Sequence, residues 1–153
     1  KYLDRNLIAV VQRVKSCSVE IKDYPATLIS QGMLVFIGIE VEDTDDDIKY
    51  ITHKLLKLRI FNDDSDKMNL SVEDIDAEIM IVSQFTLCGE TKKGNRPSYI
   101  NAMKADQARD LYNQFTFYLS GCYNKIKTGT FQADMEIHLV NDGPVTLIVR
   151  SKH

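Results

Sequence analysis

Polar side chains follow directly after an apolar run in the middle of the chain. Residues Ala77 to Gln84 form this run, and Ser83-Gln84-Phe85-Thr86-Leu87 ends it with hydroxyl, amide and aromatic groups in succession. Backbone amides at such a strand end can line an oxyanion site, and Phe85 can stack on a base. The alternative, equally compatible with the composition, is a strand end at which Ser and Thr cap a turn.

A second polar segment, Asn141-Asp142-Gly143-Pro144-Val145-Thr146, lies near the end of the chain. Its composition is first of all a turn signal, and spacing alone favours a turn. A Gly-Pro bond can also be cis at modest cost, and a cis bond would point successive carbonyls the same way into a pocket. Rigid carbonyls can accept the ammonium of one enantiomer's aminoacyl group and exclude a side chain placed where only hydrogen fits. The chemistry available here is chiral recognition.

The histidines do not suggest a catalytic triad, which needs a nucleophile, a base and an orienting acid. His53 falls in a predicted helix, His153 is the terminal residue, and His138 falls in an alternating strand, where a structural role is more common. The sequence also contains no Gly-x-Ser-x-Gly elbow and no Walker-type phosphate loop. Side-chain triads and nucleotide hydrolysis are therefore not expected.

Two polar loops have an ordinary and a functional interpretation. The loop Thr91–Arg96 carries Lys92, Lys93 and Arg96, and by itself reads most simply as a solvated loop. The segment Asn62-Asp-Asp-Ser-Asp66 looks like a calcium loop, but it lacks the central Gly and the distal Glu of the EF-hand pattern. We predict a solvated turn there.

Apolar periodicity predicts the elements that position these segments. Helical spacing indicates an amphipathic helix from about Asp45 to Lys57, capped by Thr44, and a second helix from about Ala105 to Leu119, ended by Gly121. The predicted strands are Leu7–Ile21 (one long strand or a bent pair), Thr27–Ile29, Met33–Ile39, Leu58–Phe61, Ala77–Gln84, Lys125–Lys127, Met135–Val140 and Val145–Val149. This pattern indicates layered mixed sheets with two helices packed on one side.

Size and composition indicate one domain. Residues 7–153 are expected to form it, with residues 1–6 as an N-terminal extension or a cloning remnant. The apolar runs are far shorter than the roughly 20 residues needed to span a bilayer. Three widely spaced cysteines favour a reducing cytoplasm and give no metal site. A net charge of −3 argues against coating long nucleic acids, though not against binding one RNA end, and a chain this long needs neither cofactor nor metal to fold.

These segments together resemble the D-aminoacyl-tRNA deacylase family. The family's two hallmark motifs, Ser-Gln-x-x-Leu and Asn-x-Gly-Pro-x-Thr, are intact at Ser83–Leu87 and Asn141–Thr146. Further segments match in the expected order and extend the resemblance from about Leu7 to Val149: Val10–Val14, Leu58–Phe61, Lys67–Ser71, Lys92–Ser98 and Gly129–Met135. Two departures, Cys88 in place of a frequent aromatic residue and Leu7-Ile8 in place of Met-Arg, lie outside the hallmark motifs.

The resemblance implies an α/β fold of three layers, α/β/β, with mixed sheets and two main helices, which pairs as a homodimer with active sites at the interface. It implies that Ser83, Gln84, Phe85 and Thr86 are the catalytic segment, and that Gly143 and Pro144 select chirality in the partner's site. Arg13 would hold that motif. The implied substrate-binding residues are Arg13, Ala102, Met135 and Asn141, and the implied tRNA-binding residues are Lys92, Lys93 and Arg96.

The resemblance therefore predicts a cytoplasmic enzyme that hydrolyses the ester between a D-amino acid, or glycine, and the 3′-terminal adenosine of tRNA, and that rejects L-aminoacyl-tRNA. The resemblance also implies that the 2′-hydroxyl of the RNA assists the reaction, while the enzyme positions the ester and stabilises charge. The lack of a good base in the sequence agrees with this. No metal or other cofactor is expected. The alternatives are a nucleic-acid-binding module and an inactive homologue.

Overall fold

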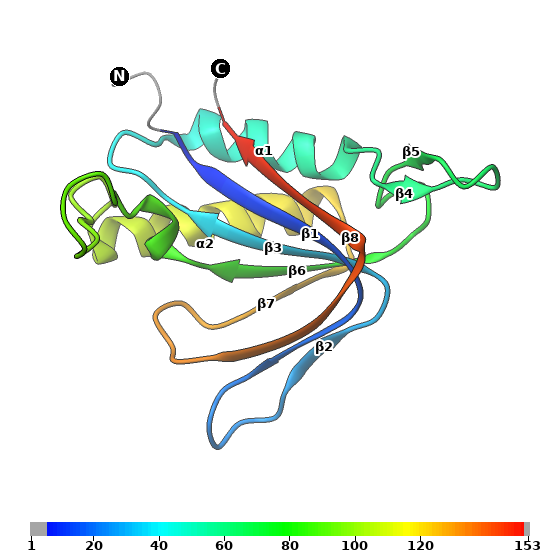
Figure 1. Ribbon diagram of the computed structural model, residues 1–153, viewed down its shortest axis with the longest axis horizontal. Helices are drawn as coiled ribbons and strands as arrows, with labels where there is room; N and C mark the ends of the chain where they lie inside the picture. Colours follow the sequence, from blue (N-terminus) through cyan, green and yellow to red (C-terminus); the bar gives the residue numbers. More distant parts are fainter. Residues whose placement is uncertain (1–5, 152–153) are drawn as a thin grey trace.

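The fold is seen in a computed structural model that describes residues 6–151. Residues 1–5 of the predicted N-terminal extension lie outside the described residues, as do Lys152 and the histidine at position 153. The elements are two long helices, a six-stranded sheet, a two-stranded sheet and a short 3-10 helix (Figure 1). None of the helices in residues 6–151 is both long enough and apolar enough to cross a membrane.

The large sheet is mixed, as predicted. The strands β2 (Thr27–Ile29), β1 (Ile8–Glu20), β3 (Gly32–Gly38), β6 (Glu78–Ser83) and β7 (Ile126–Thr128) lie in that order, and β8 (Glu136–Arg150) pairs with β1. The pairs β3–β6 and β6–β7 are parallel, whereas β1 is antiparallel to β2, β3 and β8. The first predicted strand is thus one long strand, not a pair.

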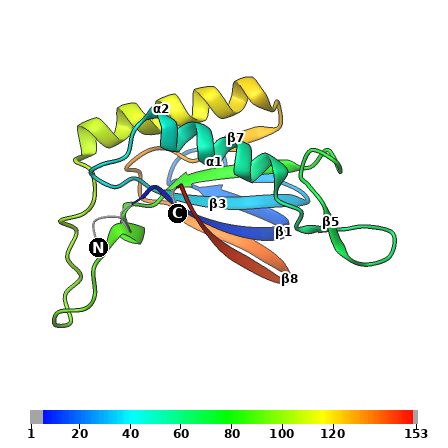
Figure 2. The same cartoon turned by 90° about the horizontal axis from the view of Figure 1, so that it is seen from above.

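Both helices cover the same face of the sheet (Figure 2). Helix α1 (Asp45–Lys57) has the predicted bounds, because Thr44 is its N-cap and three acidic residues occupy its first turn. Helix α2 (Ala105–Cys122) begins as predicted but continues past Gly121. The prediction that Gly121 ends the helix is wrong: Gly121 does not adopt the positive φ with which a glycine ends a helix, and the last turn closes where the N–H of Tyr123 donates to the carbonyl of Leu119 (2.9 Å).

Two apolar cores separate three layers. The larger core lies between the helices and the sheet and includes Val35, Ile81 and Phe115. The second core lies on the opposite sheet face, where the bent far halves of β1 and β8, with β2, fold over β3 and β6; it includes Val19, Leu34 and Met80. The α/β/β arrangement with mixed strands and two helices is therefore confirmed.

A small hairpin extends beyond the end of α1. It consists of β4 (Phe61–Asn62) and β5 (Met68–Leu70), with the Asn62–Asp66 segment in its loop. The predicted strand from Leu58 to Phe61 is largely wrong, because regular pairing starts only at Phe61. The loop is a tight turn, as predicted: the carboxylate of Asp63 accepts hydrogen bonds from the backbone N–H groups of Ser65 (2.8 Å) and Lys67 (3.0 Å).

Candidate active site

A cavity of about 710 Å³ opens at the end of β6. Ser83 and Gln84 lie at its rim because β6 ends there, and Phe85 follows in the short 3-10 helix η2 (Phe85–Cys88). The other walls come from the loop before α2, the start of α2 and the loop before β8. These further lining residues include Tyr99, Ala102, Met103, Lys104, Phe131, Gln132, Asp134 and Met135. Ser83, Gln84, Phe85, Ala102 and Met135 are thus brought together at one cavity, which Thr86, the last residue of the predicted catalytic segment, does not line.

The Ser83–Leu87 segment presents aromatic and amide groups to this cavity. The N–H of Gln84 donates to the carbonyl of Ile37 (2.7 Å), which extends the ladder with β3 by one residue before the chain turns. Phe85 is about half exposed (56%) and meets Tyr99 edge to face, with ring centroids 5.0 Å apart. The Gln84 amide donates to the Thr86 hydroxyl (2.5 Å). An exposed ring beside a polar strand end is suited to stacking on a base.

The backbone amides of Phe85 and Thr86 stand at the start of η2. The first N–H groups of a helix have no intrahelical acceptor, whereas Leu87 and Gly89 donate back to Gln84 (3.2 Å) and Thr86 (3.0 Å). The two interpretations of this segment therefore coexist, since it is a tight turn and still leaves early amides available to a substrate oxygen.

The Asn141–Thr146 segment is a bulge within one continuous strand. Gln12 of β1 pairs with Thr146 and Val14 pairs with Asn141, so Arg13 alone faces the four residues from Asp142 to Val145. The turn interpretation, with separate strands on either side, is wrong, because pairing with β1 keeps the chain in one direction through β8. The Gly143–Pro144 peptide bond is cis, and Gly143 has φ of +124°, a backbone conformation that favours glycine.

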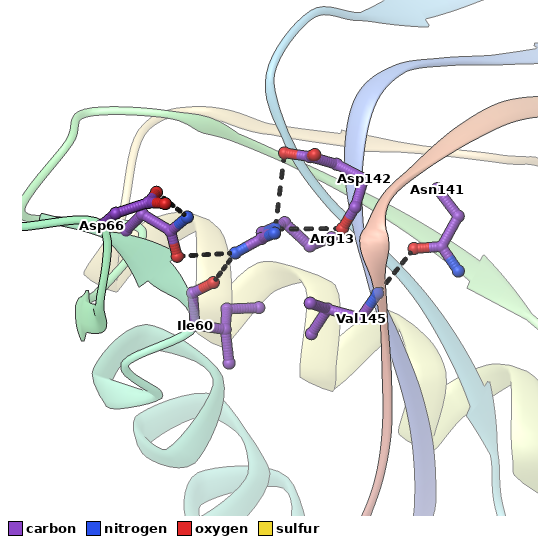
Figure 3. Close-up of polar contacts among 7 residues, drawn as sticks. Arg13, Ile60, Asp66, Asn141, Asp142 and Val145 are labelled. Atoms are coloured by element: carbon purple, nitrogen blue, oxygen red, sulfur yellow. Dashed lines mark hydrogen bonds and ion pairs between the residues drawn. The ribbon is translucent and has the colours of Figure 1, made fainter.

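Arg13 connects this bulge to the β4–β5 hairpin (Figure 3). Its Nε donates to the carbonyl of Asp142 (3.1 Å), and its Nη1 donates to the carbonyl of Ile60 (2.7 Å) and to Oδ1 of Asn62 (3.2 Å). The Asp142 carboxylate also lies 3.4 Å from Nε. The guanidinium is buried and forms hydrogen bonds with the bulge on one side and with the hairpin on the other.

The side chain of Asn141 forms hydrogen bonds within the bulge. Its amide nitrogen donates to the Thr146 hydroxyl (2.9 Å), and its carbonyl oxygen accepts from the N–H of Val145 (3.1 Å). Both ends of the Asn141 amide are therefore used inside the bulge. A substrate-binding role for Asn141 would have to act through the shape of the bulge.

The two motifs occupy different ends of the chain's fold. None of Arg13, Asn141, Gly143 and Pro144 lines the cavity that Ser83 and Phe85 line. The bulge lies where β8 bends beside the β4–β5 hairpin, and the segment after β6 lies at the opposite end of the sheet (Figure 1). One chain alone does not combine the two motifs in one site.

The basic residues lie on an exposed loop next to the cavity. Lys92, Lys93 and Arg96 are exposed, and a β-bridge between Glu90 and Ser98 closes the loop. None of the three basic residues lines the cavity, whereas Tyr99, which follows the loop, does. Sequence reasoning missed Tyr99, Lys104 and Asp134 as wall residues; their place after a Pro-closed loop and beside predicted Ala102 and Met135 was the available signal.

The histidines and cysteines in the described residues lie away from the cavity or are unreactive. His53 bonds to Tyr118 (2.9 Å) between the helices. His138 is exposed beside Glu20 and Glu136, with Nε2–Oε1 distances of 3.5 and 3.9 Å, in a group whose potential ligand atoms lie within 4.8 Å of one another. Burial raises the pKa of the Cys88 thiol to about 12, so Cys88 is not a nucleophile.

Comparison with known proteins agrees with the motifs. Residues 10–150 match the protein family described as D-Tyr-tRNA(Tyr) deacylase. Proteins named D-aminoacyl-tRNA deacylase from Flavobacterium johnsoniae and Cytophaga hutchinsonii are each 49% identical, over 145 and 148 residues; these alignments cover 94% and 96% of this chain and 97% and 99% of those proteins.

A solved structure has the same fold. The structure of the c-Myc DNA Unwinding Element Binding Protein is similar with a TM-score of 0.90 and 42% sequence identity, and the match covers 95% of this chain and 99% of that chain. The fold, the two hallmark motifs and the family match over residues 10–150 agree with one another. The chain belongs to the D-Tyr-tRNA(Tyr) deacylase family.

Proposed function

We propose that this protein hydrolyses the ester between a D-amino acid, or glycine, and the 3′-terminal adenosine of tRNA, and that it rejects L-aminoacyl-tRNA. The observation that carries the proposal is the cavity at the end of β6, lined by the intact Ser83-Gln84-Phe85 segment, in a chain that belongs to a deacylase family. Phe85 and Tyr99 would hold the terminal adenine, and Ala102 and Met135 would close the walls.

The chemistry would rely on positioning and on backbone amides. The N–H groups of Phe85 and Thr86 would bind the oxyanion, an interaction worth roughly 3–4 kcal/mol per donor in comparable sites. No histidine within residues 6–151 lines the cavity, and the Thr86 hydroxyl bonds to a neutral amide that cannot remove its proton. The 2′-hydroxyl of the terminal ribose would therefore assist the attack on the ester.

A homodimer would complete the site. Gly143 and Pro144 would enter the partner's cavity and reject L-amino acids, since within one chain they lie far along β8 from the cavity residues. β8 pairs only with β1 among the described strands, and it exposes Leu147 and Ile148, an apolar edge suited to a second copy. Size-exclusion chromatography with light scattering tests the dimer.

The basic loop would bind the acceptor stem. Lys92, Lys93 and Arg96 are exposed on the loop that leads to Tyr99, a residue of the cavity wall, so they would meet the phosphates of the tRNA beyond its bound end. The three cysteines are free thiols, which supports the cytoplasm as the compartment.

The decisive experiment compares hydrolysis of D-Tyr-tRNA and L-Tyr-tRNA by substoichiometric enzyme. Rapid, D-selective turnover is expected, and cleavage of neither ester by a folded protein would contradict the proposal.

A DNA-binding role is the second candidate, because one similar structure is named a DNA unwinding element binding protein. The net charge of −3 argues against it. Tight binding to duplex DNA without deacylation would favour it.

A further inference from the structure

A chain of hydrogen bonds links the β4–β5 loop to the bulge of β8. Asn62 donates from Nδ2 to Oδ1 of Asp66 (2.9 Å), and its Oδ1 accepts from Nη1 of Arg13 (3.2 Å). Nε of Arg13 in turn donates to the carbonyl of Asp142 (3.1 Å), which directly precedes Gly143 (Figure 3). The Asn62–Asp66 segment is therefore connected to the Asn141–Thr146 bulge through the side chain of Arg13.

The carboxylate of Asp66 fixes the orientation of the Asn62 amide. A carboxylate only accepts hydrogen bonds, so it selects the amide nitrogen and leaves the amide oxygen for Arg13. The reverse orientation would direct an NH₂ group at a guanidinium, which also only donates. Asp66 is itself held by the turn, since its N–H donates to the carbonyl of Asp63 (2.9 Å).

The orientation of the guanidinium in turn constrains Gly143. Ile60 and Asn62 provide both acceptors of Nη1, while Nη2 lies 2.9 Å from the point that a Cβ on Gly143 would occupy. Rotation of the guanidinium toward this glycine would press on the bulge, and rotation away would lose the Asp142 carbonyl. Asn62 is the side-chain acceptor that opposes both movements.

We propose that Asn62 and Asp66 are positioning residues for chiral selection: acting through Arg13, they hold Gly143 and Pro144 in the place from which L-amino acids are rejected. This inference rests on the proposed deacylase function. Both residues are exposed, so their substitution leaves the two cores intact, and the predicted defect is in selectivity.

The test is the ratio of kcat/KM for D-Tyr-tRNA to that for L-Tyr-tRNA, with enzyme raised until L-Tyr-tRNA cleavage is measurable. Asn62→Ala is expected to lower this ratio by about three- to tenfold, the effect of one ordinary hydrogen bond, because the contact with Arg13 is long and only partly buried. The exchanged pair Asn62→Asp/Asp66→Asn is expected to restore it to within about twofold, because the carboxylate then accepts from Arg13 and from the new amide.

Asn69→Ala is the matched control, because Asn69 lies in the same hairpin and bonds to Arg59 and Asp63 instead of Arg13. It is expected to leave the ratio unchanged. An Asn62→Ala ratio equal to that of the control, or an exchanged pair no better than Asn62→Ala, overturns the inference. Wild type that hydrolyses neither ester, or both equally, contradicts the proposed function instead.

Discussion

The bulge is supported by a buried cation, and the cavity end by buried carboxyl groups. At the bulge, Arg13 is only 7% exposed and bonds to the Ile60 and Asp142 carbonyls. At the cavity end, the wall around Ala102 forms a β-bridge with Glu40, and Glu40 and Asp43 are buried behind that wall. One end is fixed by a guanidinium, and the other includes Asp43, a carboxyl group that can gain or lose a proton.

The bulge and the cavity end should therefore respond differently to pH. Burial is the main cause that raises the pKa of Asp43 from 3.8 to about 7. The nearby carboxyl groups of Asp47 and Glu40 contribute to the rise, and the Glu40 N–H, which donates to Asp43 at 2.6 Å, opposes it. A guanidinium keeps its charge over this whole range. The bulge is therefore expected to keep its geometry while the support behind the cavity wall titrates.

The largest effect is expected from Gly143→Ala, which breaks the bulge. The added Cβ would lie 2.9 Å from both Nη2 of Arg13 and Cγ2 of Val145, at a φ of +124° that alanine rarely adopts. A displacement of about 1 Å in a positioning element can cost roughly 100-fold in rate. We expect a loss of that order in kcat/KM for D-Tyr-tRNA, measured by deacylation.

Gly94→Ala is the control for this prediction. Gly94 also has a positive φ (+66°), but no atom lies within 4 Å of its would-be Cβ. Near wild-type kinetics for Gly94→Ala with a severe defect for Gly143→Ala would tie the loss to contacts at the bulge. Equal, mild effects in both variants would argue that the bulge has no role in the reaction.

Asp43→Asn tests the titrating end. Because the folded pKa of Asp43 lies above its unfolded value, the stability that its proton contributes is complete below about pH 4 and is lost as the pH rises through about 7. The free energy of unfolding should fall by up to about 1.4 kcal/mol per pH unit in this window. Urea unfolding at a series of pH values should show a flatter profile for Asp43→Asn.

Asp63→Asn tests a carboxyl group whose pKa is shifted in the direction opposite to that of Asp43. The N–H of Lys67, followed by smaller contributions, lowers the pKa of the exposed Asp63 carboxyl. The stability from Asp63 is therefore lost only as the pH falls below about 4, outside the Asp43 window. If the free energy of unfolding varied with pH in the same way in wild type and in Asp43→Asn from about pH 4 to 7, the predicted contribution of Asp43 protonation to stability would be contradicted.

The elements that sequence predicted well are those specified locally. Helix α1 has the predicted bounds because Thr44 and the acidic first turn act within a few residues of its start. The β8 bulge was misread as a turn because Asn-Asp-Gly-Pro favours a turn locally, while the strand direction is set by pairing with β1, more than 120 residues away in sequence.

In the candidate site, too, the residues that belong to local motifs could be predicted, and the contacts between distant residues could not. Ser83, Ala102 and Met135 could be assigned from the motifs and do line one cavity. The contact of Asn62 with Arg13 spans 49 positions and left no periodic signal. The buried acids Glu40 and Asp43 were missed for another reason, since charged residues in a sequence predict the surface unless a partner is visible.

A smaller effect is expected from the basic loop beside the cavity. Each cation that meets a phosphate contributes about 0.7–0.9 to the slope of log affinity against log salt, so replacing Lys92, Lys93 and Arg96 by Gln should lower that slope by up to about 2–3. Filter binding of tRNA at several salt concentrations measures it. Replacing Lys49, Lys54 and Lys57 of α1 by Gln removes the same charge elsewhere; an equal slope change in both variants would mean that the loop makes no phosphate contact.

The smallest effect is expected from substitution of Thr86. This test distinguishes a catalytic role of the Thr86 hydroxyl from a catalytic role of the 2′-hydroxyl of the RNA. The Thr86 hydroxyl accepts from Gln84, and no base contacts it among the described residues, so Thr86→Ser and Thr86→Val should each keep activity within about fivefold. A D-Tyr-tRNA whose terminal ribose lacks the 2′-hydroxyl should instead be cleaved far more slowly. Complete loss of deacylation in Thr86→Val, with folding and tRNA binding unchanged, would assign the catalytic role to the Thr86 hydroxyl. The cavity end would then resemble the bulge, because a single protein side chain would control the reaction there.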